Sequence, residues 1–300
     1  MILKARALTC GFLLLATLPV QTAAAALRKP VALVYQVKGD ARRSELGRPR
    51  VLVRLYDGLP AGTTLDLAPG SRLALAFVTG KRYELSGQAR ATLGKGDLGT
   101  RSGGVRSLPS VPPLPQLPPI APDDRPGPSA GAMRIRGERV TGLYPFHGVA
   151  VLAEEAVLHF QPITDARGYR IEVQDGEGWT VFRADVESPP VEVPAGRLRA
   201  GFRYWWTVRT LDRPGPVAQG EAELVTLSAR AARAREEVRE ILTAEGAGCL
   251  PLLAEIDRGL GLWLEARDEL RTALDEESGD PALREALAVI ESRLEEGNGR

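Results

Sequence analysis

The sequence has few of the residues on which disulfide and metal chemistry depend. Only two cysteines and two histidines occur in its 300 residues. Cys10 lies in the amino-terminal leader and Cys249 lies in an apolar helical run, so we expect no intramolecular disulfide and a buried, inert thiol at Cys249. His147 and His159 lack the further His or Cys partners that a metal site requires. We therefore expect no metal site.

Patterns typical of catalytic sites are equally scarce. No nucleophile elbow accompanies the two histidines, so a Ser-His-Asp triad is not indicated. Gly94-Lys95-Gly96 lacks the spacing and the following Ser or Thr of a phosphate-binding loop. The adjacent Glu154 and Glu155 would point to opposite faces of a strand, although a carboxylate-pair glycosidase stays open on sequence alone. We expect a non-enzymatic protein with no catalytic residues and no cofactor.

Lysine is rare, and charge is unevenly distributed. Only five lysines occur, so nearly all positive charge is arginine. Residues 27–107 carry 15 Lys and Arg against 6 Asp and Glu, a net charge of +9, whereas residues 228–300 carry 10 against 17, a net charge of −7. The basic and acidic regions could attract each other or opposite partners, or both could simply be solvated surfaces.

Long apolar runs are absent beyond the amino terminus. Residues 1–26 have the pattern of a signal peptide: Lys4 and Arg6 precede an apolar segment, Gly11–Val20, and small residues offer a cleavage site before Leu27. That segment is shorter than the roughly 20 residues of a membrane span. We expect a periplasmic or secreted chain that is not an integral membrane protein after cleavage, with an uncleaved anchor as the alternative.

Residues 27–101 contain short apolar runs separated by Gly and Pro, which predict a small all-β module. The predicted strands are Val31–Val37, Val51–Tyr56, Leu73–Val78 and Tyr83–Leu85. Three turn motifs, Val37-x-Gly39-Asp40, Leu59-Pro60-Ala61-Gly62-Thr63-x-Leu65 and Pro69-Gly70-Ser71, resemble those of FecR-like periplasmic domains. The resemblance implies a β fold. It leaves open a role as an accessory to envelope signalling, although the sigma-regulating members carry a cytoplasmic segment and a membrane span not seen here.

Residues 102–132 are predicted to form a linker. Nine prolines lie between Pro109 and Pro128. This composition favours extended polyproline II structure and excludes regular sheet or helix. The segment also has the PxxP spacing that aromatic grooves bind, so a ligand role is the alternative to a spacer.

Residues 133–227 are predicted to form an immunoglobulin-like β-sandwich. Tyr204, Trp206 and Val208 alternate with Trp205, Thr207 and Arg209, as in a half-buried strand. The other predicted strands are Met133–Ile135, Ala150–Leu152, Val157–Phe160, Tyr169–Gln174, Trp179–Ala184, Pro190–Val193 and Glu221–Thr226. The motifs Phe160-x-Pro162 and Leu198-x-x-Gly201-x-x-Tyr204-x-Trp206 resemble a fibronectin type III domain. The resemblance implies a tyrosine corner at Tyr204, whose hydroxyl would bond upstream backbone.

Residues 228–300 are predicted to form a helical tail. Gly and Pro divide it into four helices: Ala229–Ala244, Cys249–Arg258, Trp263–Glu276 and Ala282–Glu295. Ser228 and Asp280 are the expected N-caps of the first and the last. The middle pair resembles one tetratricopeptide repeat, with small and large residues at the positions the repeat expects. One repeat cannot bury its face alone, so the flanking helices should cover it.

Taken together, these patterns predict a multidomain, mainly β protein with an α-helical C-terminal tail, acting as an exported interaction or scaffold protein of the bacterial envelope. Partner proteins are expected, without nucleic acid, and Trp205 and Trp263 are the candidate partner-facing aromatics. The alternative is binding of an anionic glycan or lipid through a patch of arginines: Arg42, Arg43, Arg48, Arg50 and Arg54.

Overall fold

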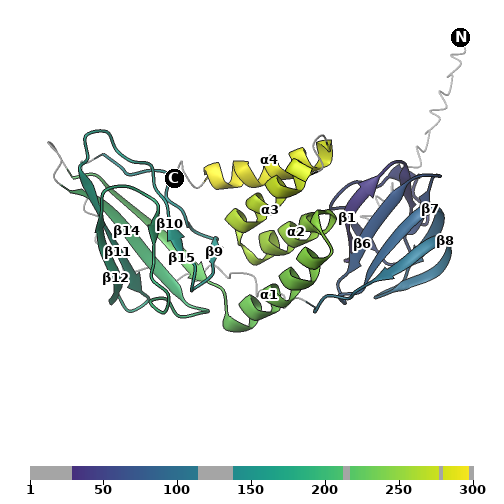
Figure 1. The fold of residues 1–300 in the computed structure, drawn as a ribbon, viewed down its shortest axis with the longest axis horizontal. Coiled ribbons are helices and arrows are strands. Elements are labelled where there is room, and N and C mark those ends of the chain that lie inside the picture. Colours follow the sequence, from purple (N-terminus) through teal and green to yellow (C-terminus); the bar gives the residue numbers. More distant parts are fainter. Residues whose placement is uncertain (1–28, 114–137, 212–216, 277–279, 297–300) are drawn as a thin grey trace, which may run out of the picture.

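The helical region lies between two β modules (Figure 1). A computed structural model describes residues 29–113, 138–211, 217–276 and 280–296. Its described part is mainly β, with four α-helices near the carboxyl end. The region expected as a tail therefore contacts both modules.

The first module is one antiparallel sheet whose order is β3-β2-β5-β7-β6-β1-β4, with β8 paired to β7. The first half of β7 pairs with β6 and its second half pairs with β5, while β8 runs along both halves. Its strands are β1 (Pro30–Lys38), β2 (Ala41–Ser44), β3 (Val51–Leu52), β4 (Gly58–Pro60), β5 (Thr64–Leu67), β6 (Arg72–Phe77), β7 (Arg82–Leu93) and β8 (Leu98–Leu108).

Three boundaries in this module differ by more than two residues from the sequence prediction. The predicted strand Tyr83–Leu85 is part of the much longer β7, which continues to Leu93. β8 runs through position 101 to Leu108, so residues 102–108 belong to the sheet and not to the linker. The predicted strand Val51–Tyr56 stops at Leu52. Beyond it the chain turns, and Tyr56 adopts a positive φ of 62°. The linker prolines from Pro115 to Pro128 and the leader, residues 1–26, lie outside the described residues.

The second module is a five-stranded sheet, ordered β12-β11-β14-β15-β9, with a two-stranded sheet β10-β13. Its predicted strands are found within a few residues, except Met133–Ile135, which lies outside the described residues. The bounds are β9 (Ala150–Val151), β10 (Val157–Leu158), β11 (Gly168–Asp175), β12 (Thr180–Val186), β13 (Val191–Glu192), β14 (Arg203–Leu211) and β15 (Gln219–Thr226).

Strand β14 organises the core of this sandwich. Tyr204, Trp206 and Val208 are buried, as the alternation predicts, and the Trp206 indole N–H donates to the Pro145 carbonyl at 2.9 Å. The Tyr204 hydroxyl accepts a hydrogen bond from the Arg199 backbone N–H at 2.8 Å. The tyrosine-corner contact that the sequence implied is therefore present.

The helices are α1 (Ala229–Ala244), α2 (Leu250–Leu260), α3 (Trp263–Glu276) and α4 (Pro281–Glu296), with a 3-10 turn, η1 (Ala247–Cys249), before α2. Both predicted caps are confirmed. The Ser228 hydroxyl accepts from the Ala231 N–H at 3.2 Å, and the Asp280 carboxylate accepts from the Ala282 N–H at 2.8 Å. Each satisfies a backbone donor that the first turn of a helix leaves unpaired.

Candidate functional site

A buried arginine joins the first module to the helices. Arg82, at the start of β7, is 0% exposed. Its Nε donates to the Pro109 carbonyl at 2.8 Å, and its guanidinium also contacts the Glu245 carboxylate after α1 and the Cys249 sulfur. Burial, and then the nearby Glu245 charge, raise the pKa of the Cys249 thiol. The thiol stays protonated and unreactive, as the sequence predicted.

Apolar packing and one further hydrogen bond surround this arginine. The Tyr56 hydroxyl donates to the Pro251 carbonyl in α2 at 2.7 Å. Tyr35 is 1% exposed and belongs to a hydrophobic cluster in which strand residues Ala74 and Ala76 meet helix residues such as Val238 and Leu252. The first module and the helical region therefore share a continuous buried interface.

A second interface joins the helices to the sandwich. Tyr144, Phe146 and Val149 are buried, and Trp263, Leu264 and Leu294 pack against them from α3 and α4. The Ala150 N–H donates to the Gly261 carbonyl at 3.0 Å. The Arg293 guanidinium lies 5.3 Å from the centre of the Phe146 ring, a cation–π distance. Trp263, expected to face a partner, instead lies at this internal interface.

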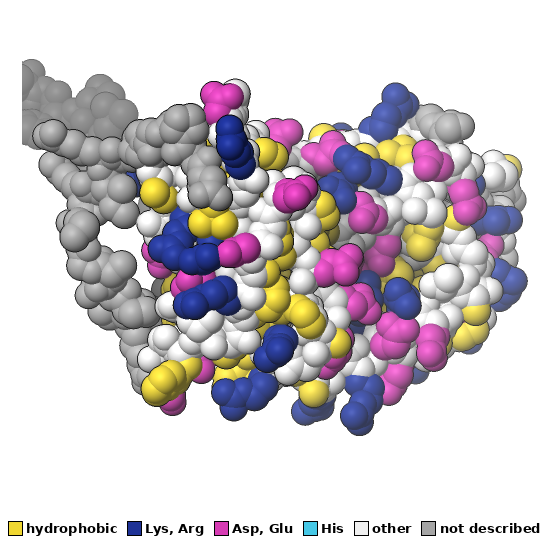
Figure 2. All heavy atoms as spheres, turned by 60° about the vertical axis from the view of Figure 1, so that its left-hand side comes forward, with side chains coloured by type: hydrophobic (Ala, Val, Ile, Leu, Met, Phe, Trp, Pro, Cys, Tyr) yellow, Lys and Arg dark blue, Asp and Glu magenta, His cyan; other side chains and the backbone are white. Residues whose placement is uncertain are grey.

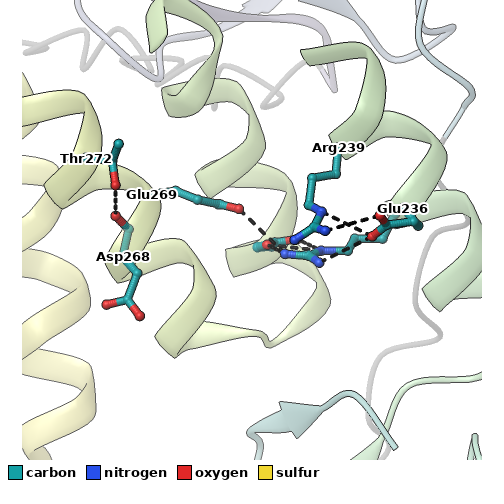
Figure 3. A network of polar contacts seen from close by, with 7 residues as sticks. Glu236, Arg239, Asp268, Glu269 and Thr272 are labelled. Carbon is teal, nitrogen blue, oxygen red and sulfur yellow. Dashed lines mark hydrogen bonds and ion pairs between the residues drawn. The ribbon is translucent and has the colours of Figure 1, made fainter. Parts of the chain in front are cut away.

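Within the helical region, a buried ion pair links α1 to α2. Arg235 is 4% exposed and Asp257 is 0% exposed. Their side chains form three hydrogen bonds of 2.5–3.2 Å. Glu269 of α3 approaches the same guanidinium at 3.6 Å, and Glu236 and Arg239 form a neighbouring pair on α1 (Figure 3). Burial first, and then the Asp257 charge, raise the pKa of Glu269 to about 9.

The raised pKa of Glu269 predicts that the stability of the folded chain depends on pH. An unfolded glutamate has a pKa of about 4.3. Between that pH and pH 9, the folded chain therefore holds a proton on Glu269 that the unfolded chain has lost. The free energy of unfolding should therefore fall as pH rises through this window. Glu269→Gln copies the protonated form, and urea titrations should show a larger stabilisation at pH 8 than at pH 5. Equal effects at both pH values would contradict this, and the exposed Glu240→Gln is the control.

A groove opens where the first module meets the helices. Its volume is about 490 Å³. One wall comes from β1 and the turn after β3, and the other from η1, α2 and α4. The lining is mainly apolar, including Val37, Val53, Leu55, Pro251, Leu283 and Val289. A concave, mostly apolar site between two structural units is a typical ligand-binding position.

Four of the five arginines predicted as an anion-binding patch are paired with carboxylates. Arg42 pairs with Asp40, Arg43 with Asp57, Arg48 with Glu45 and Arg50 with Asp66. Among the described residues, the Arg54 side chain has no such partner, and Arg54 lines the groove. Of the five arginines that the sequence prediction grouped into one patch, Arg54 is the one that lines the groove. On the face in Figure 2, positive and negative side chains are mixed.

Trp205 and the two histidines do not line the groove. Trp205 lies on β14, opposite the core face, and is partly exposed. His147 bonds the Glu223 carboxylate on an exposed surface. His159 contacts the Tyr144 ring. Burial, and then the Arg267 charge, lower the pKa of its imidazole.

The described residues include no group of three or more His, Cys, Asp or Glu that could hold a metal ion.

Comparisons with known proteins place the chain in no family. No protein-family model and no curated protein matches it. Similar solved structures include CopC from Methylosinus trichosporium OB3b, 18% identical, covering 31% of this chain and 96% of that one with a TM-score of 0.25. Chicken CNTN1 FN1-FN3 domains are 11% identical, with coverages of 67% and 64% and a TM-score of 0.22. Likenesses this weak carry no functional argument.

Across the described ranges, no helix is both long enough and apolar enough to span a bilayer.

Proposed function

We propose that this chain is a non-enzymatic, exported interaction protein of the bacterial cell envelope, and that it holds partner-binding surfaces in a fixed arrangement. The observation that supports this most directly is the helical region, which is packed against a β module on each side. Contacts at both junctions, a partly buried one between Arg82 and Glu245 and an apolar one between Phe146 and Trp263, favour one stiff unit over three separately moving parts.

The proposal includes a finer reading of each unit. The first module is FecR-like, the sandwich is fibronectin type III-like and the middle helices are tetratricopeptide-like. Three features support it: the turn glycines of the first module, the Tyr204 contact with Arg199, and the packing of Ala254 in α2 beside Ala266 and Leu270 in α3. Export to the periplasm is part of the same proposal and rests on the leader pattern.

Co-purification from the envelope tests this function. The tagged chain, expressed in a bacterium with a comparable envelope, should be recovered from the periplasmic fraction with defined partner proteins after mild cross-linking. A variant that weakens the junctions, Arg82→Ala, should recover less of the same partners, because the surfaces would no longer hold their spacing. Recovery of the chain alone, at the mass of a single copy, would contradict the proposal.

A further inference from the structure

The groove between the first module and α4 is walled by elements far apart in the sequence. Tyr35, Val53 and Leu55 come from the first module, whereas Pro251, Leu283 and Val289 come from the helical region. Its volume of about 490 Å³ lies within the range of about 300–1,000 Å³ that is usual for binding pockets. Val289 is 60% exposed, which leaves an apolar side chain open at the rim.

Two opposite charges line this groove without partners of their own. Arg54 belongs to the first module and Glu285 to α4. Within the described residues, neither side chain forms a hydrogen bond or ion pair, while the nearby Arg43 and Asp57 are paired with each other at 3.7 Å. An exposed charge that stays unpaired beside an apolar groove is available to a ligand.

The turn that carries Arg54 is held in place by its own hydrogen bonds. The Arg54 N–H donates to the Asp57 carboxylate at 2.9 Å, and the Asp57 N–H donates to the Arg54 carbonyl at 3.2 Å. Tyr56, with φ of 62°, is fixed by its N–H to the Val34 carbonyl and by its hydroxyl to Pro251. A non-glycine residue in this backbone region persists only where surrounding contacts impose it, often at binding sites. The wall is therefore preorganised.

We propose that this groove binds an extended peptide segment of a partner protein. The segment is apolar at its centre, with a carboxylate facing Arg54 and a cationic side chain facing Glu285. Two opposite charges favour a peptide over a fatty acid, which supplies only a carboxylate. The inference rests on the proposed function, since it names the kind of partner segment that an interaction protein of this shape would take.

A charge-reversal series on the full chain tests the inference. The probe is a blocked synthetic peptide of one aspartate, three valines and one lysine, and its binding is measured by calorimetry. Arg54→Glu and Glu285→Arg should each weaken binding about tenfold or more, because each replaces an attraction with a repulsion. The double variant should restore affinity to within about threefold, since the peptide can bind in the reverse direction.

Matched controls separate charge from folding. Arg48→Glu changes the same charge on the same module outside the groove and should leave binding unchanged. Val289→Asp should weaken binding by introducing a charge at the apolar rim, and all these exposed substitutions should leave the circular dichroism spectrum unaltered. A peptide that fails to bind, or binds equally to Arg54→Glu, overturns the inference. If envelope partners still co-purify with the chain in that case, the proposed function stands without the groove.

Discussion

Replacing Asp257 by alanine is expected to lower the free energy of unfolding by about 3–5 kcal/mol, the usual cost of leaving one member of a buried ion pair without its partner. Arg235 would keep its charge at 4% exposure. The carboxyl groups left near it would be those of Glu269 at 3.6 Å and of the more exposed Glu236 at 3.9 Å. Chemical denaturation followed by circular dichroism measures the loss.

Two further variants sharpen this test. Asp268→Asn removes an exposed carboxylate that pairs with Arg267, and it should cost no more than about 1 kcal/mol. The double variant Arg235→Met/Asp257→Leu should recover most of the stability, because apolar side chains often replace a buried ion pair without loss. A loss below 1 kcal/mol for Asp257→Ala would show that this pair does not stabilise the helical region.

Arg82→Ala is the second substitution with a large expected effect. It removes the guanidinium that contacts Glu245, Pro109 and Cys249, together with the packing of a fully buried side chain. We expect a loss of about 3 kcal/mol in the stability of the junction, because a fully buried side chain and its hydrogen bond to the Pro109 carbonyl are both removed, while Glu245 stays in contact with solvent. Because this contact joins two structural units, the first module should then unfold in a separate transition.

Calorimetry distinguishes local from junction effects for this variant. The unaltered chain should unfold with the first module and helices in one transition, whereas Arg82→Ala should show two. Arg72→Ala, which removes an arginine that is exposed and paired with Glu84, is the matched control and should keep one transition. A single unshifted transition for Arg82→Ala would mean that the junction does not depend on this arginine.

The helices and the central strand of the sandwich could be predicted because local signals specify them. Ser228 and Asp280 cap their helices as their positions suggested, and the bounds of α1 and α3 match the expected ranges. The alternation around Trp206 identified which face is buried. Helix caps and a period of two are properties of neighbouring residues, so they can be read without knowledge of the tertiary structure.

Four strands of the first module, β2, β4, β5 and β8, were not predicted, and three of them have weak local signals. β2 carries the polar sequence Ala41–Ser44, β4 is three residues long and β8 contains Gly103 and Gly104. Each is a strand because of its pairing partner, and β8 follows β7 along most of its length. Pairing between distant segments overrides local preference, which explains why the linker was predicted to begin at residue 102.

The groove and the buried charges depend on contacts across long sequence separations. Arg82 carries no local signal of burial, because β7 is a largely polar strand and its partner Glu245 lies in another structural unit. Arg54 was grouped with four other arginines because sequence proximity does not show which guanidinium has a carboxylate beside it. Trp263 looked available to a partner because its packing against Phe146 involves the other module.

The claim that the helices hold both β modules in one arrangement is tested most directly by a distance between those modules. Spin labels at two exposed positions, Lys95→Cys in the first module and Ser188→Cys in the sandwich, can be introduced with Cys10→Ser, while Cys249 stays buried. Pulsed electron–electron double resonance should give one narrow distance distribution, which Arg82→Ala broadens. A broad distribution in the otherwise unaltered chain would contradict the account.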